Sequence, residues 1–291
     1  MSLSVWDTAL IVLKTMTYAA TLGAAGAVFF LRYSASLIAR PDRLKIRSIV
    51  LGLALLSVLA GAALIPVTAG SMSGGAAGMW DGSLITMVWQ AGAGRANAIR
   101  AAAVLLAALG VASGRASWLA FFGAVVAAMS FAWTGHARAL NLGPLPIALQ
   151  SVHLLGVAFW LGALAPLAVV VRGGDLSCIA VTAARFGVSA LFVVGGLMAA
   201  GLGLLWMMLG GVAELWRSAY GRYVMLKLAF VACLLCLAAF NKLRLTPRLL
   251  AGESRAVRSL RASIRLESLF GVLILAVTAT LTTVTGPPAL D

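Results

Sequence analysis

The sequence predicts an all-α protein, a polytopic transmembrane helical bundle with about eight spans. Hydrophobic residues make up 62% of the 291 residues, and charged residues only 10%. Several apolar runs approach or exceed the roughly 20 residues that a helix needs to cross a bilayer. These runs are continuous and rich in Ala and Leu, whereas the strands of a membrane barrel alternate between apolar and polar residues. Helices are therefore the expected way to pair the backbone in lipid.

We expect one transmembrane domain over residues 1–291. Its spans are predicted, in order, at 8–38, 46–67, 95–113, 117–135, 146–171, 179–209, 221–243 and 264–285. Residues 83–92 are apolar but too short to cross a membrane, so an interfacial or re-entrant segment is expected there. Small residues within the spans, such as Gly23, Gly26 and Gly110, let helix backbones approach each other closely.

Basic residues are concentrated in two of the predicted loops, 39–47 and 242–265. The positive-inside rule makes these loops cytoplasmic, so that both termini face outward, as an even number of spans requires. A net charge of +14 could also indicate a nucleic-acid partner, but membrane orientation explains basic residues that flank spans. Three cysteines provide no disulfide framework, and no polar connection is long enough to form a soluble domain.

Two histidines are the most unusual polar residues of this apolar chain. His136 lies at the outer end of the fourth predicted span, and His153 lies about 10 Å below the outer end of the fifth. The short connection makes these spans antiparallel neighbours, so both imidazoles are expected on one side of the membrane, within reach of one ion. Ionisable residues inside a membrane often mark functional sites, although a histidine can also simply hydrogen-bond a neighbouring helix.

Sulfur-containing side chains form a second pattern. All methionines after Met1 fall in outer loops or outer halves of the predicted spans, whereas the three cysteines lie deeper. Thioether sulfur and imidazole suit Cu(I), which gives the following predicted metal ligands: His136, His153, Met72, Met79, Met129, Met207 and Met208. Cys233 and Cys236 are spaced i, i+3 and could act as an inner relay. The competing interpretation is packing, because methionine fills gaps between helices and buried cysteine behaves as a small hydrophobe.

A few charged residues fall within the predicted spans. Three lie toward the outer side: Lys14, Arg100 and Lys227. We expect their long side chains to reach the membrane interface, although they could also line a polar cavity. Glu267 lies near the inner end of the last span, close in sequence to Arg261 and Arg265, and an interfacial ion pair is expected there.

Four segments follow one another in a familiar order: GHA at 135–137, His-x6-Trp-Leu-Gly at 153–162, YGRYVMLKLAFVACLLCLAAFNKLRLTPRL at 220–249 and SIRLESLFGVLILAVTATLTTVTGPP at 263–288. Together they resemble the bacterial copper resistance D (CopD) family. The resemblance covers 95–288 by motif and the first two spans by topology. It implies an inner-membrane protein that moves copper from periplasm to cytoplasm, with His136 and His153 as metal ligands. The outward-facing termini expected from the basic loops are then periplasmic.

Members of this family often carry an acidic residue shortly before the second histidine, and residues 149–152 contain none. Either a partner that orients His153 is missing, or Gln150 or Ser151 replaces the acidic residue in this role. The resemblance also implies a periplasmic copper-binding partner of the copper resistance C type, which we expect to be a separate protein.

We therefore expect a copper transport protein of the bacterial inner membrane, surrounded by lipid, with Cu(I) at an outer His/Met site. No catalytic residues, other cofactor or nucleic-acid partner are expected, so the protein is not interpreted as an enzyme. One alternative is a membrane cytochrome in which the two histidines bind haem. Another is a scaffold that binds copper without transporting it.

Overall fold

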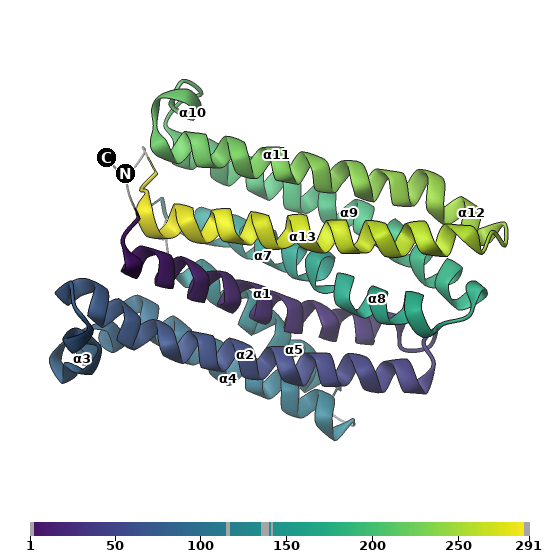
Figure 1. The fold of residues 1–291 in the computed structure, drawn as a ribbon, viewed down its shortest axis with the longest axis horizontal. Helices are drawn as coiled ribbons and strands as arrows, with labels where there is room; N and C mark the ends of the chain where they lie inside the picture. Colours follow the sequence, from purple (N-terminus) through teal and green to yellow (C-terminus); the bar gives the residue numbers. More distant parts are fainter. Residues whose placement is uncertain (1–2, 115–116, 135–139, 141, 288–291) are drawn as a thin grey trace.

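The computed structural model describes residues 3–114, 117–134, 140 and 142–287, which form a bundle of helices (Figure 1). The longer helices are α1 (Val5–Ser34), α2 (Arg40–Ser73), α4 (Gly92–Ser113), α7 (Leu145–Gly162), α8 (Leu164–Gly173), α9 (Leu176–Leu209), α11 (Ala219–Phe240) and α13 (Arg255–Val284). The shorter ones are η1 (Ala76–Trp80), α3 (Gly82–Gln90), α5 (Ser117–Met129), η2 (Ser130–Trp133), α10 (Glu214–Arg217), η3 (Asn241–Leu245) and α12 (Thr246–Leu250).

Within the described ranges, seven helical stretches are long and apolar enough to cross a membrane. One combines α7 with α8, over Leu145–Gly173, and another continues from α11 to α12, over Ala219–Leu250. The predicted span at 117–135 corresponds to a shorter apolar helix, Trp118–Trp133. The prediction of a polytopic helical bundle is confirmed, with seven long stretches and one short one where eight spans were expected.

Local sequence explains where several helices begin and end. At the start of α1, Ser4 and Asp7 form a capping box in which each side chain bonds the backbone N–H of the other. Gly74 and Gly210 end α2 and α9 in the left-handed conformation, with φ of 73° and 67°, which glycine adopts without steric cost. Pro166 cannot donate a hydrogen bond to the carbonyl of Gly162, and the chain breaks between α7 and α8 at that point.

The α1 helix lies at the centre of the bundle. It packs against α2, α4 and α5 on one side and against α7, α8 and α13 on the other (Figure 1). The α9 helix packs on α7, and α11 packs on α13 at the edge of the bundle. Much of the core is built from small residues of α1, such as Ala20, Ala24 and Ala27, which are completely buried. Small side chains let the neighbouring helices come close to α1.

The predicted loop 242–265 is largely helical, because η3 and α12 continue α11 as far as Leu250 and α13 already begins at Arg255. A loop was expected there because the segment is rich in Lys and Arg. These residues are good helix formers, so a high density of basic residues is compatible with a helix. The start of α13, α12 and the connection between α1 and α2 lie at one end of the bundle. The first turn of α1, the last turn of α13, α3 and α10 lie at the other (Figure 1).

The segment expected to be interfacial forms α3, whose first N–H groups are capped by the side chain of Asp81. This helix has no buried residues, and the large side chains of Trp80, Met87 and Trp89 around it are exposed. An apolar helix of nine residues is too short to cross a bilayer. Tryptophans that are exposed beside such a helix are typical of a membrane–water interface.

Candidate metal centre

His153 lies in the middle of α7, and its half-buried imidazole faces α9. Its Nδ1 is 3.2 Å from the backbone carbonyl oxygen of Leu197. A carbonyl oxygen only accepts hydrogen bonds, so the tautomer that forms this bond carries its proton on Nδ1, and in that tautomer the neutral ring keeps its Nε2 lone pair for a metal. Metal-binding histidines are usually held by such a hydrogen bond from the other ring nitrogen.

Close packing against α9 makes this hydrogen bond possible. Gly201 lies against the ring, where a Cβ atom would be 3.1 Å from Nδ1 and 3.2 Å from Cε1 of His153. The hydroxyl of Ser151 donates instead to the carbonyl of Ile147 in its own helix, at 2.8 Å. The partner that orients His153 is thus the backbone carbonyl of Leu197 on α9 rather than the side chain of Ser151.

His136 and the rest of 135–139 lie outside the described residues. The chain before them is described as far as Thr134. Met129 is half-buried at the end of α5, and η2 then packs against α7.

The remaining methionines proposed as ligands are distributed over two regions. Met72 is exposed near the end of α2, and Met79 of η1 packs beside Gly70 of the same helix. The α2 and α9 helices lie on opposite sides of α1 (Figure 1). Met207 and Met208 are half-buried near the end of α9, and the hydroxyl of Tyr220 donates to Sδ of Met208 at 3.4 Å. In the parts of the chain that are described, no group of three or more His, Cys, Asp or Glu side chains could hold a metal.

The cysteines occupy two different environments. Cys178 donates from Sγ to the carbonyl of Leu37 at 3.1 Å, which joins the start of α9 to the connection between α1 and α2. Cys233 and Cys236 are exposed on α11. Because α11 lies at the edge of the bundle, the two residues proposed as an inner relay are at the surface of this chain.

Cationic side chains within the spans are bound by neutral groups. Lys14 Nζ donates to the carbonyl of Thr282 at 2.8 Å and to Oγ1 of Thr283 at 2.9 Å. The buried Arg100 lies 3.8 Å above the ring of Phe131 and donates to side chains of α4 and η2: Asn97 and Ser130. Arg100 does not reach the interface as expected, because hydrogen bonds and a cation–π contact compensate its burial. Lys227 is half-buried on α11, the helix at the edge of the bundle.

The expected ion pair at Glu267 is wrong. Glu267 is only 3% exposed, and its carboxyl accepts hydrogen bonds from Asn241 of η3 and from Ser263, one turn earlier on α13. Arg261 donates from both Nε and a terminal nitrogen to the carbonyl of Val171, at 3.1 and 2.8 Å. The helical periodicity of α13 places Glu267 toward the interior, which sequence proximity to arginine did not reveal.

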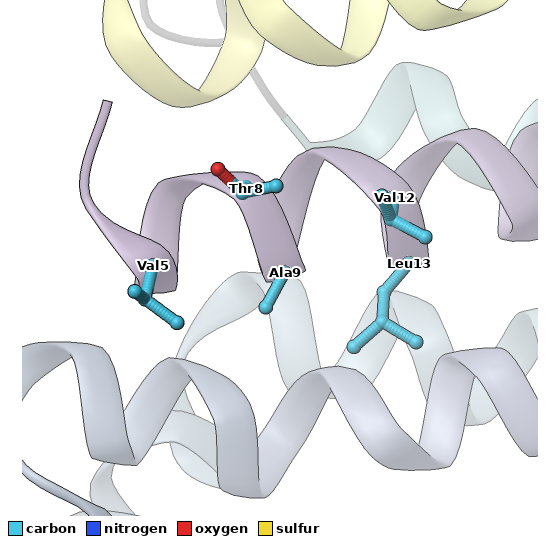
Figure 2. A pocket seen from close by; sticks show the side chains of 5 residues that line it. All are labelled: Val5, Thr8, Ala9, Val12 and Leu13. Atoms are coloured by element: carbon cyan, nitrogen blue, oxygen red, sulfur yellow. The ribbon is translucent and has the colours of Figure 1, made fainter. Parts of the chain in front are cut away.

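A surface groove of about 480 Å³ follows the first turns of α1 (Figure 2). It is lined by apolar side chains and by Thr8, whose hydroxyl already donates to the carbonyl of Ser4. It offers no imidazole, thiol or thioether. The groove therefore has no ligands for a soft metal, and we assign no site to it.

Comparison with known proteins supports the interpretation of the sequence. Residues 5–145 match the family model described as copper resistance protein D-like, N-terminal domain, and residues 180–281 match copper resistance protein D. The copper transport protein CutJ of Bacillus subtilis (strain 168) is 27% identical over 172 residues. This match covers 58% of the chain and 30% of that relative, so the chain spans about a third of the relative's length. No solved structure matches the chain.

The matched segments include most of the helices described above. Residues 146–179 lie between the two matched segments. They include nearly all of α7, with His153, and the whole of α8. The long apolar helices make the protein a multi-pass membrane protein. With both family models in sequence order along one bundle, the chain belongs to the copper resistance protein D family.

Proposed function

We propose that this protein transports copper as Cu(I) across the bacterial inner membrane, from periplasm to cytoplasm, and that His153 and His136 hold the ion near the outer side. Family membership supports copper handling. The observation that carries the site is the hydrogen bond from Nδ1 of His153 to Leu197, because it leaves Nε2 free for a metal. Transport rather than catalysis is proposed.

The chemistry of the proposed site suits an ion that must bind and then leave. Imidazole and thioether groups are neutral ligands that Cu(I) accepts, with Met129 as the nearest candidate in sequence before His136. A site that is not too tight favours conduction over storage.

Delivery to this site would begin at the outer end of the bundle. Met72 is exposed there, and Met79 lies in the following η1. We propose that these two methionines receive Cu(I) from a separate periplasmic protein of the copper resistance C type, and that Met207 and Met208 near the end of α9 provide further weak sites. Cys233 and Cys236 could serve as ligands only where another chain covers the surface of α11.

The first prediction concerns His153. We expect His153→Ala to lower Cu(I) affinity by at least about tenfold. Loss of a group that merely orients a metal ligand already lowers metal affinity by about tenfold or more, and loss of the ligand itself should cost at least as much. Bound copper is measured by elemental analysis of purified protein, and initial uptake is measured in proteoliposomes under reducing conditions. His136→Ala is measured in the same way.

Ser151→Ala is the matched control, because Ser151 lies on the same helix and its hydroxyl donates to the backbone carbonyl of Ile147 in that helix. Unchanged copper binding in both histidine variants would overturn the proposed site. Copper binding without uptake would favour a scaffold. A strong visible haem band in the wild-type sample, lost in the histidine variants, would favour a cytochrome.

A further inference from the structure

Glu267 is a buried carboxyl group that the proposed copper path does not yet use. It lies in α13, within a stretch that can cross a membrane, and is 3% exposed. An ionised carboxylate in such surroundings is costly unless a cation or several hydrogen bonds compensate it. Among the described residues, the one ion pair within bonding distance joins Lys45 and Asp42, and Glu267 has none.

The groups that face the Glu267 carboxyl are uncharged and come from three elements. Asn241 of η3 donates from Nδ2 to Oε1, and Ser263 of α13 donates from Oγ to the same oxygen at 3.4 Å. The indole of Trp160 on α7 also faces the carboxyl group. Asn241 begins a π-helical turn, a rare local structure that is frequent at functional sites.

The nearby cations are directed elsewhere. Lys242 donates to the carbonyl of Gly187 at 3.0 Å, Arg261 donates to the carbonyl of Val171, and Arg265 is exposed. The other charged or titratable side chains on the elements packed against α13 are Asp7, Lys14, Tyr18, Arg32 and Tyr33 of α1, His153 of α7, Arg172 of α8, Tyr220, Arg222, Tyr223, Lys227, Cys233 and Cys236 of α11, Arg244 of η3 and Arg248 of α12. None of these side chains forms an ion pair with Glu267.

The neighbouring amide is suited to a carboxyl group that gains and loses a proton. Asn241 Oδ1 is buried and has no hydrogen-bond partner in the described structure. A neutral Glu267 carries an O–H that can donate to this oxygen, whereas an ionised Glu267 can only accept from Nδ2. The amide therefore offers one partner for each protonation state, and protonation would satisfy an oxygen that is otherwise unpaired.

Glu267 also lies beyond His153 on the route toward the basic end of the bundle. His153 and Trp160 are seven residues apart on α7, which corresponds to about 10 Å along the helix. Leu197, whose carbonyl binds His153, packs in one cluster with Trp160. The same helix and the same cluster thus connect the proposed copper ligand to the buried carboxyl.

We propose that Glu267 is a proton-binding site that releases its proton when the copper ion comes near and takes up a proton after the ion has left. This inference rests on the proposed copper transport. In the copper-free bundle the carboxyl is neutral. When Cu(I) comes near, the O–H bond breaks, and the proton leaves for water at the basic end of the bundle. The carboxylate balances the ion's charge without binding it tightly, because oxygen is a poor ligand for Cu(I). A proton from the same water returns after the ion has left.

Infrared spectroscopy of the purified protein in detergent tests this proton site. The copper-free wild type should show a carboxylic-acid carbonyl band that is missing in Glu267→Gln, and addition of Cu(I) should remove the band from the wild type. Ser268→Ala is the matched control, because its hydroxyl bonds its own helix. Absence of the band from the copper-free wild type, or its persistence with Cu(I) bound, would overturn the inference.

Uptake into proteoliposomes provides the second measurement. Acidifying the basic side of the bundle should slow wild-type uptake by up to roughly tenfold per pH unit, the limit for one proton, and Glu267→Gln should abolish this dependence. Glu267→Asp keeps the carboxyl and should keep the dependence. Wild-type uptake with the same pH profile in Glu267→Gln would overturn the inference and leave copper transport intact. Absence of wild-type uptake would instead overturn the proposed transport, while the infrared result would still decide the proton site.

Discussion

At the scale of single residues, backbone oxygens take the place of missing carboxylates. The chain has 22 basic and 8 acidic residues, so most cations inside the bundle need another acceptor. Lys14, Lys242 and Arg261 each donate to a backbone carbonyl, and so does His153. A buried donor must be paired with some acceptor, but the identity of that acceptor depends on which helix lies opposite.

Asp175 provides a test at the same scale, because it caps α9 from the connection before it. Its Oδ1 accepts from the backbone N–H of Cys178 at 2.7 Å and from the Ser177 hydroxyl at 3.0 Å. These hydrogen bonds favour the carboxylate and lower the pKa of Asp175. A lowered pKa in the folded state means that the cap stabilises the fold at neutral pH and that this contribution is lost as pH falls through the lowered pKa.

We therefore expect Asp175→Ala to lower the thermal midpoint of the purified protein at neutral pH. The difference from wild type should shrink as the pH is lowered toward about 3, measured by circular dichroism in detergent. Ser177→Ala, which removes only the hydroxyl partner, should have a smaller effect. A difference that stays constant over this pH range would contradict the role of the ionised cap.

At the scale of helices, α1 and α7 cross with their backbones in close contact. A Cβ atom added to Gly26 would lie 1.9 Å from the carbonyl oxygen of Ala158 and 2.5 Å from Cα of Gly162. Small residues let these backbones meet, as the sequence predicted for Gly26. The crossing fixes the position of α7 and hence of His153.

Gly26→Ala should force α1 and α7 apart and destabilise the bundle by about 1–3 kcal/mol, the usual cost of overpacking. The measurement is reversible unfolding of the purified protein in mixed micelles. Gly52→Ala is the matched control, because Gly52 lies on α2 with no atom within 4 Å of an added Cβ. Equal stability of the two variants would show that the crossing tolerates a methyl group.

The α11 helix illustrates how the structure departs from the predicted elements. The sequence predicted that this helix ends near 243, whereas it continues through η3 and α12 to Leu250. The π-helical turn at Asn241 is closed by Thr246, whose Oγ1 donates to the carbonyl of Asn241 at 2.9 Å. Asn241 is thereby oriented toward Glu267, a contact that no periodicity in the sequence could have indicated.

At the scale of the whole molecule, the distribution of basic residues predicts the orientation in the membrane. The basic segment around α12 should be cytoplasmic, and the end with the first turn of α1 should be periplasmic. In a variant without native cysteines, we expect Ala77→Cys to react with a membrane-impermeant maleimide added to intact spheroplasts. Glu253→Cys should react only after the membrane is opened. The reverse pattern would invert the proposed direction of transport.

The sequence by itself determined the membrane class, most of the helical segments, the family and the histidine on α7, because these follow from composition, hydrophobic runs and local motifs. It did not determine the partners of polar groups. Only the tertiary structure placed Leu197 against His153 and Asn241 against Glu267, since both contacts join residues distant in sequence. Such contacts depend on which helices become neighbours and on how each helix is rotated about its axis. The sequence does not specify either, because an apolar helix surface can face lipid or protein equally well.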